Sequence, residues 1–462
     1  MATWMAFIAG EIQSICIEAP KGNELTLSLA HLHPGFHHEG KFISSCLVYA
    51  MTLFAHQYSQ VIIVGAGPCG LLLAVLLSKQ GVQVQVLEAS TELDDQPRAC
   101  HYSAPAKFEL ERAGVLDSIS AEGFFPRSVC WRKNDGSHIV GLNHEIEPES
   151  SVHRMVALEL GRVVQILYNA AAEQEGTEVL MGHRVTAVGQ DDLSAWVEVA
   201  LPSGQSDQFS ADYIIGCDGA SSQVRRSLFG DFEFPGWTWE QQIIATNVYY
   251  DFAKFGYEDS NFIVHPQDWH MAAKISKDNL WRVTYGDVPG LTKEQYAERL
   301  PARYEQILPG QPKPSSYKVT NVGPYKMHQR LAKSLRVGRF LLAGDAAHLC
   351  NPFGGLGLTG GIADVGALYD ALVGIHKGVA DEQILTEYSE ARSAKYREYV
   401  DPLSTANFRR LWEKDPETTV AEDGFFQMVR EAQADPDVAK KMLEVRSSHD
   451  SFAYWGKWAD LV

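Results

Sequence analysis

The sequence predicts a mixed α/β fold, in which a parallel-sheet domain is interrupted by an antiparallel sheet and followed by a helical segment. Residues 61–88 have the order of a buried strand, a glycine-rich turn, a helix and a second strand. Two further apolar strands, at 213–216 and 338–343, each lead into a turn that contains glycine and aspartate. Between these turns, residues 241–285 alternate apolar and polar side chains, which is typical of antiparallel strands.

The first glycine-rich turn has the spacing of a dinucleotide site. Gly65, Gly67 and Gly70 follow the first strand at G-x-G-x-x-G spacing, with Pro68 among them. Glycines let the backbone approach a pyrophosphate closely, and the N–H groups at the helix start stabilise its negative charge. Glu88 ends the second strand, where a carboxylate can hold the hydroxyls of an adenosine ribose. We therefore expect a dinucleotide here, and an ordinary glycine-rich turn is the alternative.

A second helix start of this kind follows the strand at 338–343. Gly344 and Asp345 come first, and a loop with three more glycines then opens a helix over about 358–375. Asp345 is placed to accept hydrogen bonds from a polyol such as a ribityl chain. The helix start offers N–H groups to an anion, and a reduced flavin carries negative charge near N1 and O2. Two helix starts that bind anions, far apart in the sequence, suit one long dinucleotide.

Composition excludes several classes of protein. The 462 residues are 45% hydrophobic, which is enough for a large core and two or more domains. A net charge of −18 without a basic run argues against a nucleic-acid partner. The seven cysteines are scattered and form no C-x-x-C pair, so we expect neither disulfides nor a metal site, and we expect a reducing, cytoplasmic compartment.

Residues 1–58 are predicted to be a poorly ordered extension. Their apolar run at 46–55 is shorter than the roughly 20 residues needed to cross a bilayer, so we expect no membrane span. The run also lies too far from the start to be a signal peptide. Four histidines precede it, and we interpret them as polar residues, because no carboxylate or cysteine spacing supports a ligand set. These residues are His31, His33, His37 and His38.

With these motifs the chain resembles the class A flavoprotein monooxygenases, the aromatic hydroxylases related to p-hydroxybenzoate, salicylate and phenol hydroxylases. It looks most like the members found in fungal secondary metabolism. Three motifs carry the resemblance and together cover about 61–375. They are Gly65–Gly70 with Glu88, Cys217-Asp218-Gly219 with Arg225, and Gly344–His348 with Asn351–Gly357.

The resemblance implies a domain plan. A glutathione-reductase-type FAD-binding Rossmann domain is expected at 59–235 and 332–378. A substrate-binding antiparallel sheet is expected between them, at 236–331, and a helical C-terminal segment at 379–462.

The resemblance also implies how FAD is held. Glu88 would bind the adenosine ribose, Arg98 would contact the FAD backbone, and Asp345 would hold the ribityl chain. Asp218 and Gly219 would lie near the pyrophosphate and the approach of the nicotinamide cofactor. Leu160 stands where many members have a Gln or Arg that touches the flavin, so Arg162 is expected to substitute. The residues expected to line the isoalloxazine are Pro352, Gly354, Gly355, Leu356 and Gly357.

The implied reaction is hydroxylation of a phenolic or other electron-rich aromatic ring. NADPH or NADH would reduce FAD, oxygen would add to give a flavin hydroperoxide, and its distal oxygen would be transferred to the ring. Removal of a phenol proton calls for a base or cation near the ring hydroxyl. Four polar residues of the predicted sheet are candidates, and an ordinary sheet residue is the alternative for each. They are Tyr249, His265, Arg282 and Tyr285.

The sequence leaves two other functions open. The first alternative is an FAD-dependent dehydrogenase or reductase of the same cofactor fold that inserts no oxygen. The second is an FAD-binding scaffold without a pocket. The sequence also leaves open the substrate, the choice of NADH or NADPH, and the oligomeric state, for which a homodimer is one candidate.

A protein that begins at Met51 should keep fold and activity. Folds of this type usually begin a few residues before their first strand, and Met51 stands ten positions before Val61. Comparing the FAD content and activity of the Met51 start with those of the full chain tests this prediction. A shortened protein that fails to fold, or that lacks activity, would refute it.

Overall fold

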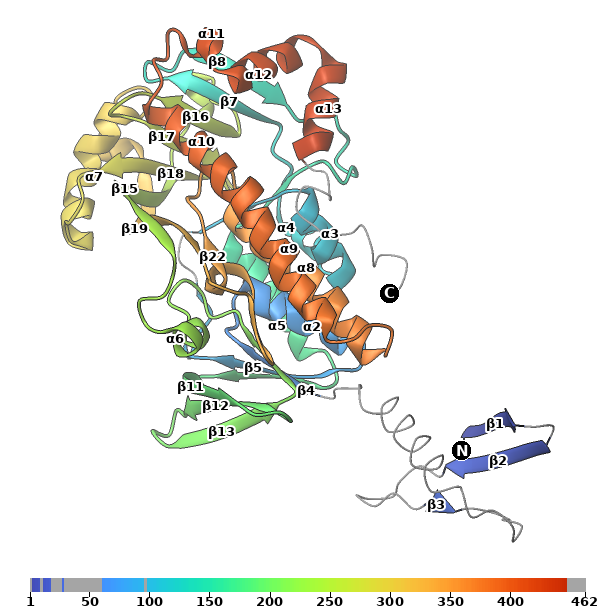
Figure 1. Ribbon diagram of the computed structural model, residues 1–462. Coiled ribbons are helices and arrows are strands. Elements are labelled where there is room, and N and C mark those ends of the chain that lie inside the picture. Colours follow the sequence, from blue (N-terminus) through green and yellow to red (C-terminus); the bar gives the residue numbers. More distant parts are fainter. Residues whose placement is uncertain (1, 9–10, 18–26, 29–59, 95–97, 447–462) are drawn as a thin grey trace. The chain divides into compact units, whose positions relative to one another are not determined.

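The computed structural model describes residues 2–8, 11–17, 27–28, 60–94 and 98–446 (Figure 1). The chain divides into two compact units, Met1–His56 and Gln57–Val462. The first unit contains an antiparallel sheet in the order β1-β2-β3. Its strands are β1 (Ala2–Ile8), β2 (Glu11–Ile17) and β3 (Leu27–Ser28). The four N-terminal histidines and Met51 lie outside the described residues, so the predictions made for them stay predictions.

The second unit contains a six-stranded sheet, whose strands have the order β10-β5-β4-β14-β21-β20. All neighbours are parallel except β20 and β21. Since parallel strands end at a common edge, the turns that follow β5, β4, β14 and β21 lie side by side. The strands are β4 (Gln60–Val64), β5 (Gln83–Glu88), β10 (Thr177–Met181), β14 (Tyr213–Gly216), β20 (Arg336–Val337) and β21 (Phe340–Leu342).

Both faces of this sheet are covered, which explains why its strands are continuous apolar runs. Helices lie on one face and a three-stranded antiparallel meander on the other (Figure 1). The helices are α2 (Pro68–Ser78), α3 (Ala104–Ala113), α4 (Leu116–Glu122), α5 (Leu160–Ala172) and α8 (Leu356–His376), and α6 (Gln223–Phe229) lies beside the meander. The meander is β11 (Arg184–Gln190), β12 (Ala195–Ala200) and β13 (Ser206–Ala211). Helix α8 is long and apolar enough to cross a membrane, but most of it is buried in this core.

The predicted antiparallel sheet is present and is larger than expected. Eight strands follow the order β22-β19-β15-β18-β17-β16-β7-β8. The expected strands are β15 (Gly236–Tyr249), β16 (Ser260–Val264), β17 (His270–Lys274), β18 (Leu280–Asp287) and β19 (Lys318–Leu331). The additional strands are β7 (Ser128–Lys133), β8 (His138–Asn143) and β22 (His348–Leu349). β7 joins through parallel pairing with β16, so the chain before residue 236 also contributes to this sheet.

Different helices pack on the two faces of the larger sheet. Helix α7 (Lys293–Ile307) packs on one face, and its start is fixed by a capping box of Thr292 and Gln295. α10, α12 and α13 pack on the other face, and α9 packs on α8, so that α9 and α10 together run from the smaller sheet to the larger one (Figure 1). These helices are α9 (Gln383–Lys395), α10 (Asp401–Trp412), α11 (Thr419–Glu422), α12 (Gly424–Ala434) and α13 (Pro436–Arg446). The helical C-terminal region and the mixed α/β fold are confirmed.

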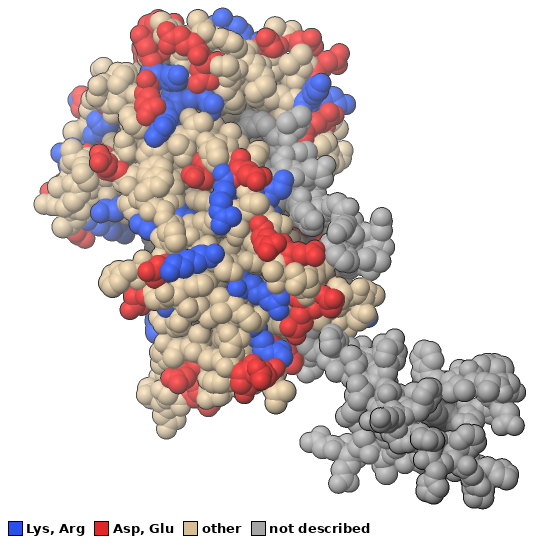
Figure 2. All heavy atoms as spheres, in the orientation of Figure 1, with Lys and Arg blue, Asp and Glu red and all other residues tan. Residues whose placement is uncertain are grey.

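Charged residues are mixed over the visible surface. Lys and Arg alternate with Asp and Glu on the face that Figure 2 shows, and no extended basic area is present there. This face therefore lacks the concentrated positive potential on which binding to a phosphate backbone depends.

Phe408 of α10 joins the C-terminal helices to the sheet. Its fully buried ring stacks on Phe353 at 4.8 Å and meets Trp239 and Trp269 edge to face. We expect Phe408→Ala to lower the free energy of unfolding by about 3–5 kcal/mol, because it leaves a large cavity. Chemical denaturation measures this loss. Phe232→Ala, at a fully exposed phenylalanine, is the control and should change stability by less than ~0.5 kcal/mol. Equal effects of the two substitutions would contradict the packing described.

Candidate active site

Three turns that are far apart in the sequence meet at one edge of the smaller sheet. The Gly65 N–H donates to the Leu87 carbonyl at 2.8 Å, and the Cys217 N–H donates to the Val64 carbonyl at 2.8 Å. The Ala343 N–H donates to the Gly216 carbonyl at 3.0 Å. These bonds continue the strand pairing into the turns, so the three sequence motifs form one continuous surface.

Close packing explains two of the glycines in the first turn. Gly65 has a φ of +106°, and a Cβ there would lie 2.5 Å from the Cys217 carbonyl oxygen. A Cβ on Gly70 would lie 2.0 Å from the Gly65 oxygen. Any side chain at either position would therefore push the turn away from its neighbour or from helix α2.

Other glycines of the motifs face open space. A Cβ added to Gly67, Gly219 or Gly355 would meet no other atom within 4 Å. Gly67 is the N-cap of α2 and Gly355 the N-cap of α8, and neither helix start has a side-chain cap. The Gly355 N–H donates to the Pro352 carbonyl at 3.2 Å. The N–H groups of the first helical turn that follow each cap can point to an anion, as a dinucleotide diphosphate or a reduced flavin ring requires. The residues present fit FAD.

Glu88 is held against the first turn by backbone donors. Its Oε2 accepts the Ala66 N–H at 2.8 Å, and its Oε1 accepts the Ser90 N–H at 2.8 Å. Each carboxylate oxygen keeps a second lone pair for a ligand hydroxyl. The position therefore suits the predicted contact with a ribose.

The second turn is fixed by Asp218 and Arg225. Asp218 accepts hydrogen bonds from the Ser222 hydroxyl at 2.5 Å and from the Gln223 N–H at 2.6 Å. Burial raises the pKa of Asp218, and these hydrogen bonds oppose the shift. Arg225 donates to the Ala346 carbonyl at 3.0 Å, so it joins the second turn to the third, and burial lowers its pKa to about 10.

A buried ion network lies beneath the third turn. Asp364 of α8 accepts the Gly344 N–H at 3.0 Å and contacts His348 Nε2 at 2.7 Å. Arg392 of α9 donates to its other oxygen at 2.6 Å. Burial opposes the charge of Asp364, but His348 and Arg392 together hold its pKa below the ordinary value. The network fixes the backbone that carries Asp345 and ties it to the C-terminal helices.

Asp345 and Tyr325 are both exposed to solvent and yet strongly desolvated. Asp345 is exposed, yet desolvation by the protein atoms around it raises its pKa, while His348 and Arg98 oppose the shift. Tyr325 of β19 is 38% exposed, and burial raises its pKa to about 12 while Arg282 opposes the shift. Because this combination is expected of side chains that line a hollow in the surface, we infer a hollow here and call it the recess.

Arg282 connects the larger sheet to the loop that carries Arg98. Its Nε donates to Asn247 Oδ1 at 2.7 Å, and its Nη1 donates to the backbone carbonyl of Arg98. Arg282 is 6% exposed, whereas the Arg98 side chain is 57% exposed and pairs with Asp94 at 3.0 Å. Arg282 is therefore the member of the predicted catalytic set that the structure places beside the recess.

The other candidates differ in position. Tyr249 donates to Asp278 at 2.7 Å and packs against Cys100 and Leu280, on the sheet face that Arg282 shares. The Nδ1 atom of His265 accepts the Asp268 N–H at 2.9 Å. Tyr285 packs in the cluster under α7, on the face of the sheet that Arg282 does not share. Arg162 is 54% exposed and pairs with Glu122 at 3.0 Å. The roles of all four residues stay predictions, and the structure does not bring His265, Tyr285 or Arg162 together with Arg282.

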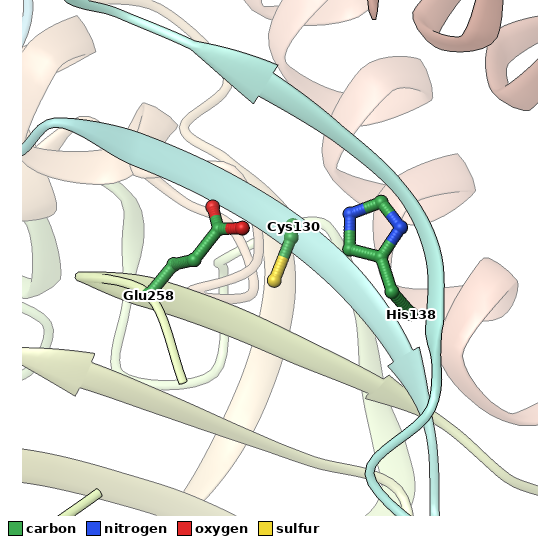
Figure 3. A group of neighbouring side chains, drawn as sticks. All are labelled: Cys130, His138 and Glu258. Carbon is green, nitrogen blue, oxygen red and sulfur yellow. The ribbon is translucent and has the colours of Figure 1, made fainter. Parts of the chain in front are cut away.

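One side-chain group has the composition of a metal site. Cys130, His138 and Glu258 hold possible ligand atoms within 4.8 Å of one another, with Cys130 between the other two (Figure 3). Burial raises the pKa of Cys130 to about 12, and its thiol donates to Asn261 at 3.2 Å. The guanidinium of Arg132 bonds the same Asn261 oxygen at 3.1 Å. A protonated thiol beside a fixed cation is poorly suited to a metal ion, which binds the thiolate.

Gly67→Val should separate cofactor binding from folding. The added side chain would enter the open space above the first turn, and the φ of −74° at this position suits valine. We expect FAD affinity to fall at least ~10-fold while the apoprotein keeps its unfolding midpoint. Flavin fluorescence titration and thermal unfolding measure the two quantities. Gly424→Ala, which also meets open space but lies at the start of α12, is the control. Unchanged FAD binding by the Gly67 variant would contradict the assignment of this space.

Several known proteins are similar to this chain in sequence and in fold. The model of the FAD binding domain family matches residues 58–402. The chain is 37% identical over 384 residues to para-nitrophenol 4-monooxygenase of Pseudomonas sp. strain WBC-3, covering 83% of this chain and 94% of the relative. It is 37% identical over 361 residues to 6-hydroxy-3-succinoylpyridine 3-monooxygenase HspB of Pseudomonas putida strain S16, covering 77% and 90%.

A solved structure is also similar. The crystal structure of p-nitrophenol 4-monooxygenase PnpA from Pseudomonas putida DLL-E4 matches with a TM-score of 0.78 at 35% identity, covering 84% of this chain and 97% of that one. The family match and these relatives each span most of the chain, so the expectations of FAD and of a monooxygenase reaction on phenolic rings are confirmed. The chain belongs to the FAD-binding-domain family of flavin-dependent aromatic monooxygenases.

Proposed function

We propose that this enzyme hydroxylates an aromatic ring at the carbon opposite a ring hydroxyl, where the ring already carries a substituent. The names of two relatives at 37% identity support this reaction class. One is a 4-monooxygenase of para-nitrophenol, in which position 4 carries the nitro group. The other is a 3-monooxygenase of 6-hydroxy-3-succinoylpyridine, in which position 3 carries the succinoyl group and lies opposite the 6-hydroxyl.

The chemistry of such a carbon determines the products. Because the carbon carries no hydrogen, formation of the new C–O bond is followed by loss of the substituent. With p-nitrophenol, the C–N bond breaks and nitrite leaves with the electron pair, and the original ring hydroxyl and the newly added hydroxyl each lose a proton to give a quinone. NADPH or NADH supplies the two electrons that reduce the other oxygen atom of O₂ to water.

The proposed cofactor contacts follow from the described turns. Glu88 would hold the adenosine ribose, and the start of α2 would hold the diphosphate. Asp345 would bind the ribityl chain, and the turn at 352–357 would meet the flavin ring. When bound there, FAD supplies the activation of oxygen, and the protein binds and orients the substrate and excludes water.

Arg282 supports a phenolic substrate. A phenolate oxygen donates electron density to the opposite ring carbon, so a cation beside that oxygen promotes ionisation of the hydroxyl. Arg282 is buried, its position is fixed by Asn247, and it lies on the sheet face beside the recess. The single observation that carries the proposal is that the names of both relatives place the new oxygen on the ring carbon opposite the hydroxyl. Arg282 would favour attack at this carbon, because its positive charge would stabilise the phenolate.

Three further properties stay predictions: a cytoplasmic location, a homodimer and a place in secondary metabolism. The reduced nicotinamide, NADPH or NADH, is identified by comparing the rates that the two support.

Product analysis with p-nitrophenol tests the proposed function. The purified, FAD-loaded protein should consume oxygen and NAD(P)H in equimolar amounts, and it should release an equimolar amount of nitrite. Oxygen electrode, absorbance and nitrite assays measure the three quantities, and phenol without a para substituent is the control. Formation of 4-nitrocatechol without nitrite would show that the ring position is wrong. Turnover without oxygen uptake would contradict the monooxygenase reaction itself.

A further inference from the structure

The face of the larger sheet that carries Arg282 meets the FAD-binding part of the chain at two places. At one end, Arg282 donates to the backbone carbonyl of Arg98. At the other end, Ile243 belongs to one apolar cluster with Phe353, which lies in the turn proposed to meet the flavin ring. Asn247, the neighbour of Arg282, and Ile243 are four residues apart on β15, which is about 13 Å along a strand. One substituted ring fits on the sheet between the two contacts.

Asn247 lies between two polar residues of the neighbouring strands. It is opposite Arg282 of β18 and opposite Asn321 of β19. Opposed residues of antiparallel strands point to the same face, and Thr246, one residue earlier, points to the other face, where it bonds Tyr304 of α7. Because neighbouring strands are about 4.8 Å apart, the backbones of Arg282 and Asn321 are separated by about 10 Å.

Each of these two residues keeps polar atoms without a protein partner. Arg282 uses Nε for Asn247 and Nη1 for Arg98, and its Nη2 makes no hydrogen bond to the residues that the structure describes. The carboxamide of Asn321 makes none either within the same ranges, and this residue is partly exposed. Tyr325, which lines the recess, comes four residues later on β19 and therefore points to the same face. A ligand above Asn247 can thus reach a guanidinium on one side and a carboxamide on the other.

The orientation of the ring decides what the carboxamide meets. In the proposed function the ring oxygen lies beside Arg282, and the opposite carbon points along β15 toward the flavin turn. Asn321, on the far side of Asn247, then faces the ring position next to that oxygen. A carboxamide has one acceptor and two donors, so it suits a hydrogen-bonding atom at this position. A plain C–H there would leave the amide unpaired once the ligand excludes water, which weakens binding.

We propose that Asn321 is a specificity-determining residue that binds a ring nitrogen or a hydroxyl next to the ring oxygen of the substrate. The substrate class is then a 2-hydroxypyridine or a catechol, with the substituent to be replaced opposite the ring oxygen. The N–H of the lactam tautomer of a hydroxypyridine donates to Oδ1 of Asn321, and a catechol hydroxyl donates to the same atom. This specificity rests on the proposed function, because that function places the ring oxygen beside Arg282.

Three ligands test the proposal by binding alone. p-Nitrophenol, 2-hydroxy-5-nitropyridine and 4-nitrocatechol all carry a nitro group opposite a ring oxygen, and they differ only at the position next to that oxygen. Each is titrated into the oxidised holoenzyme without NAD(P)H at one pH, and the change in flavin absorbance gives its Kd. We expect the pyridine or the catechol to bind at least ~10-fold more tightly than p-nitrophenol, because only these two pair with the carboxamide. The tighter of the two identifies the ring nitrogen or the hydroxyl as the recognised group.

Asn321→Leu should remove this preference. Leucine keeps the approximate shape of asparagine and has neither polar atom, so the preference should fall below ~3-fold while the Kd of p-nitrophenol changes by less than ~3-fold. The ligands differ in acidity, but this difference is the same for wild type and variant, so the change in preference isolates the side chain. Lys318→Ala, at an exposed residue of the same strand, is the control and should keep the preference of the wild type.

The FAD content of each variant reports whether the fold is intact, and Asn321→Ala provides a second test if the leucine variant does not retain FAD. A wild type that shows no preference for the pyridine or the catechol overturns the proposal. A preference that survives in both Asn321 variants also overturns it, as does an equal loss of affinity for all three ligands.

Failure of this proposal is distinguishable from failure of the proposed function. Nitrite release from p-nitrophenol upholds the position of attack, whichever ligand the Asn321 variants prefer. A preference that depends on Asn321 upholds the contact with this residue even if the product of p-nitrophenol retains its nitro group.

Discussion

The parallel order of the smaller sheet is the constraint on which the rest of the structure depends. β5, β4, β14 and β21 end at one edge, so residues separated by more than 120 positions in the chain meet in neighbouring turns. The packing of Gly65 against Cys217 permits no side chain between the first two turns. One extended dinucleotide can therefore contact Glu88 at one end of this edge and Asp345 at the other.

Buried charged groups connect this edge to the rest of the molecule. Asp364, His348 and Arg392 are nearly inaccessible to solvent, and removing one member of such a network leaves uncompensated charge in the core. Arg282 has a comparable role between the larger sheet and the Arg98 loop. These contacts join the third turn to the C-terminal helices and the larger sheet to the Arg98 loop, so the proposed sites of the flavin and of the substrate would share one framework.

Local patterns were sufficient to predict the cofactor edge but not the substrate face. The glycine turns, Glu88 and Asp345 are encoded in short segments, and the structure places them together. Alternation in a strand shows that two faces exist but does not show which one meets the recess, and for this reason Arg282 and Tyr285 could not be separated. The features that could not be predicted from the sequence depend on contacts between residues far apart in the chain. The environment of Tyr325 and the addition of β7 to the larger sheet both depend on neighbours that are distant in sequence.

The central claim is that one FAD spans the edge from Glu88 to Asp345. The most direct measurement compares the affinities of ADP and FAD for the apoprotein and for two variants, Glu88→Ala and Asp345→Ala. ADP contains the adenosine half alone, so Glu88→Ala should weaken both ligands, and Asp345→Ala should weaken FAD and leave ADP unchanged. Loss of ADP affinity in the Asp345 variant, or unchanged FAD affinity in either variant, would contradict the account.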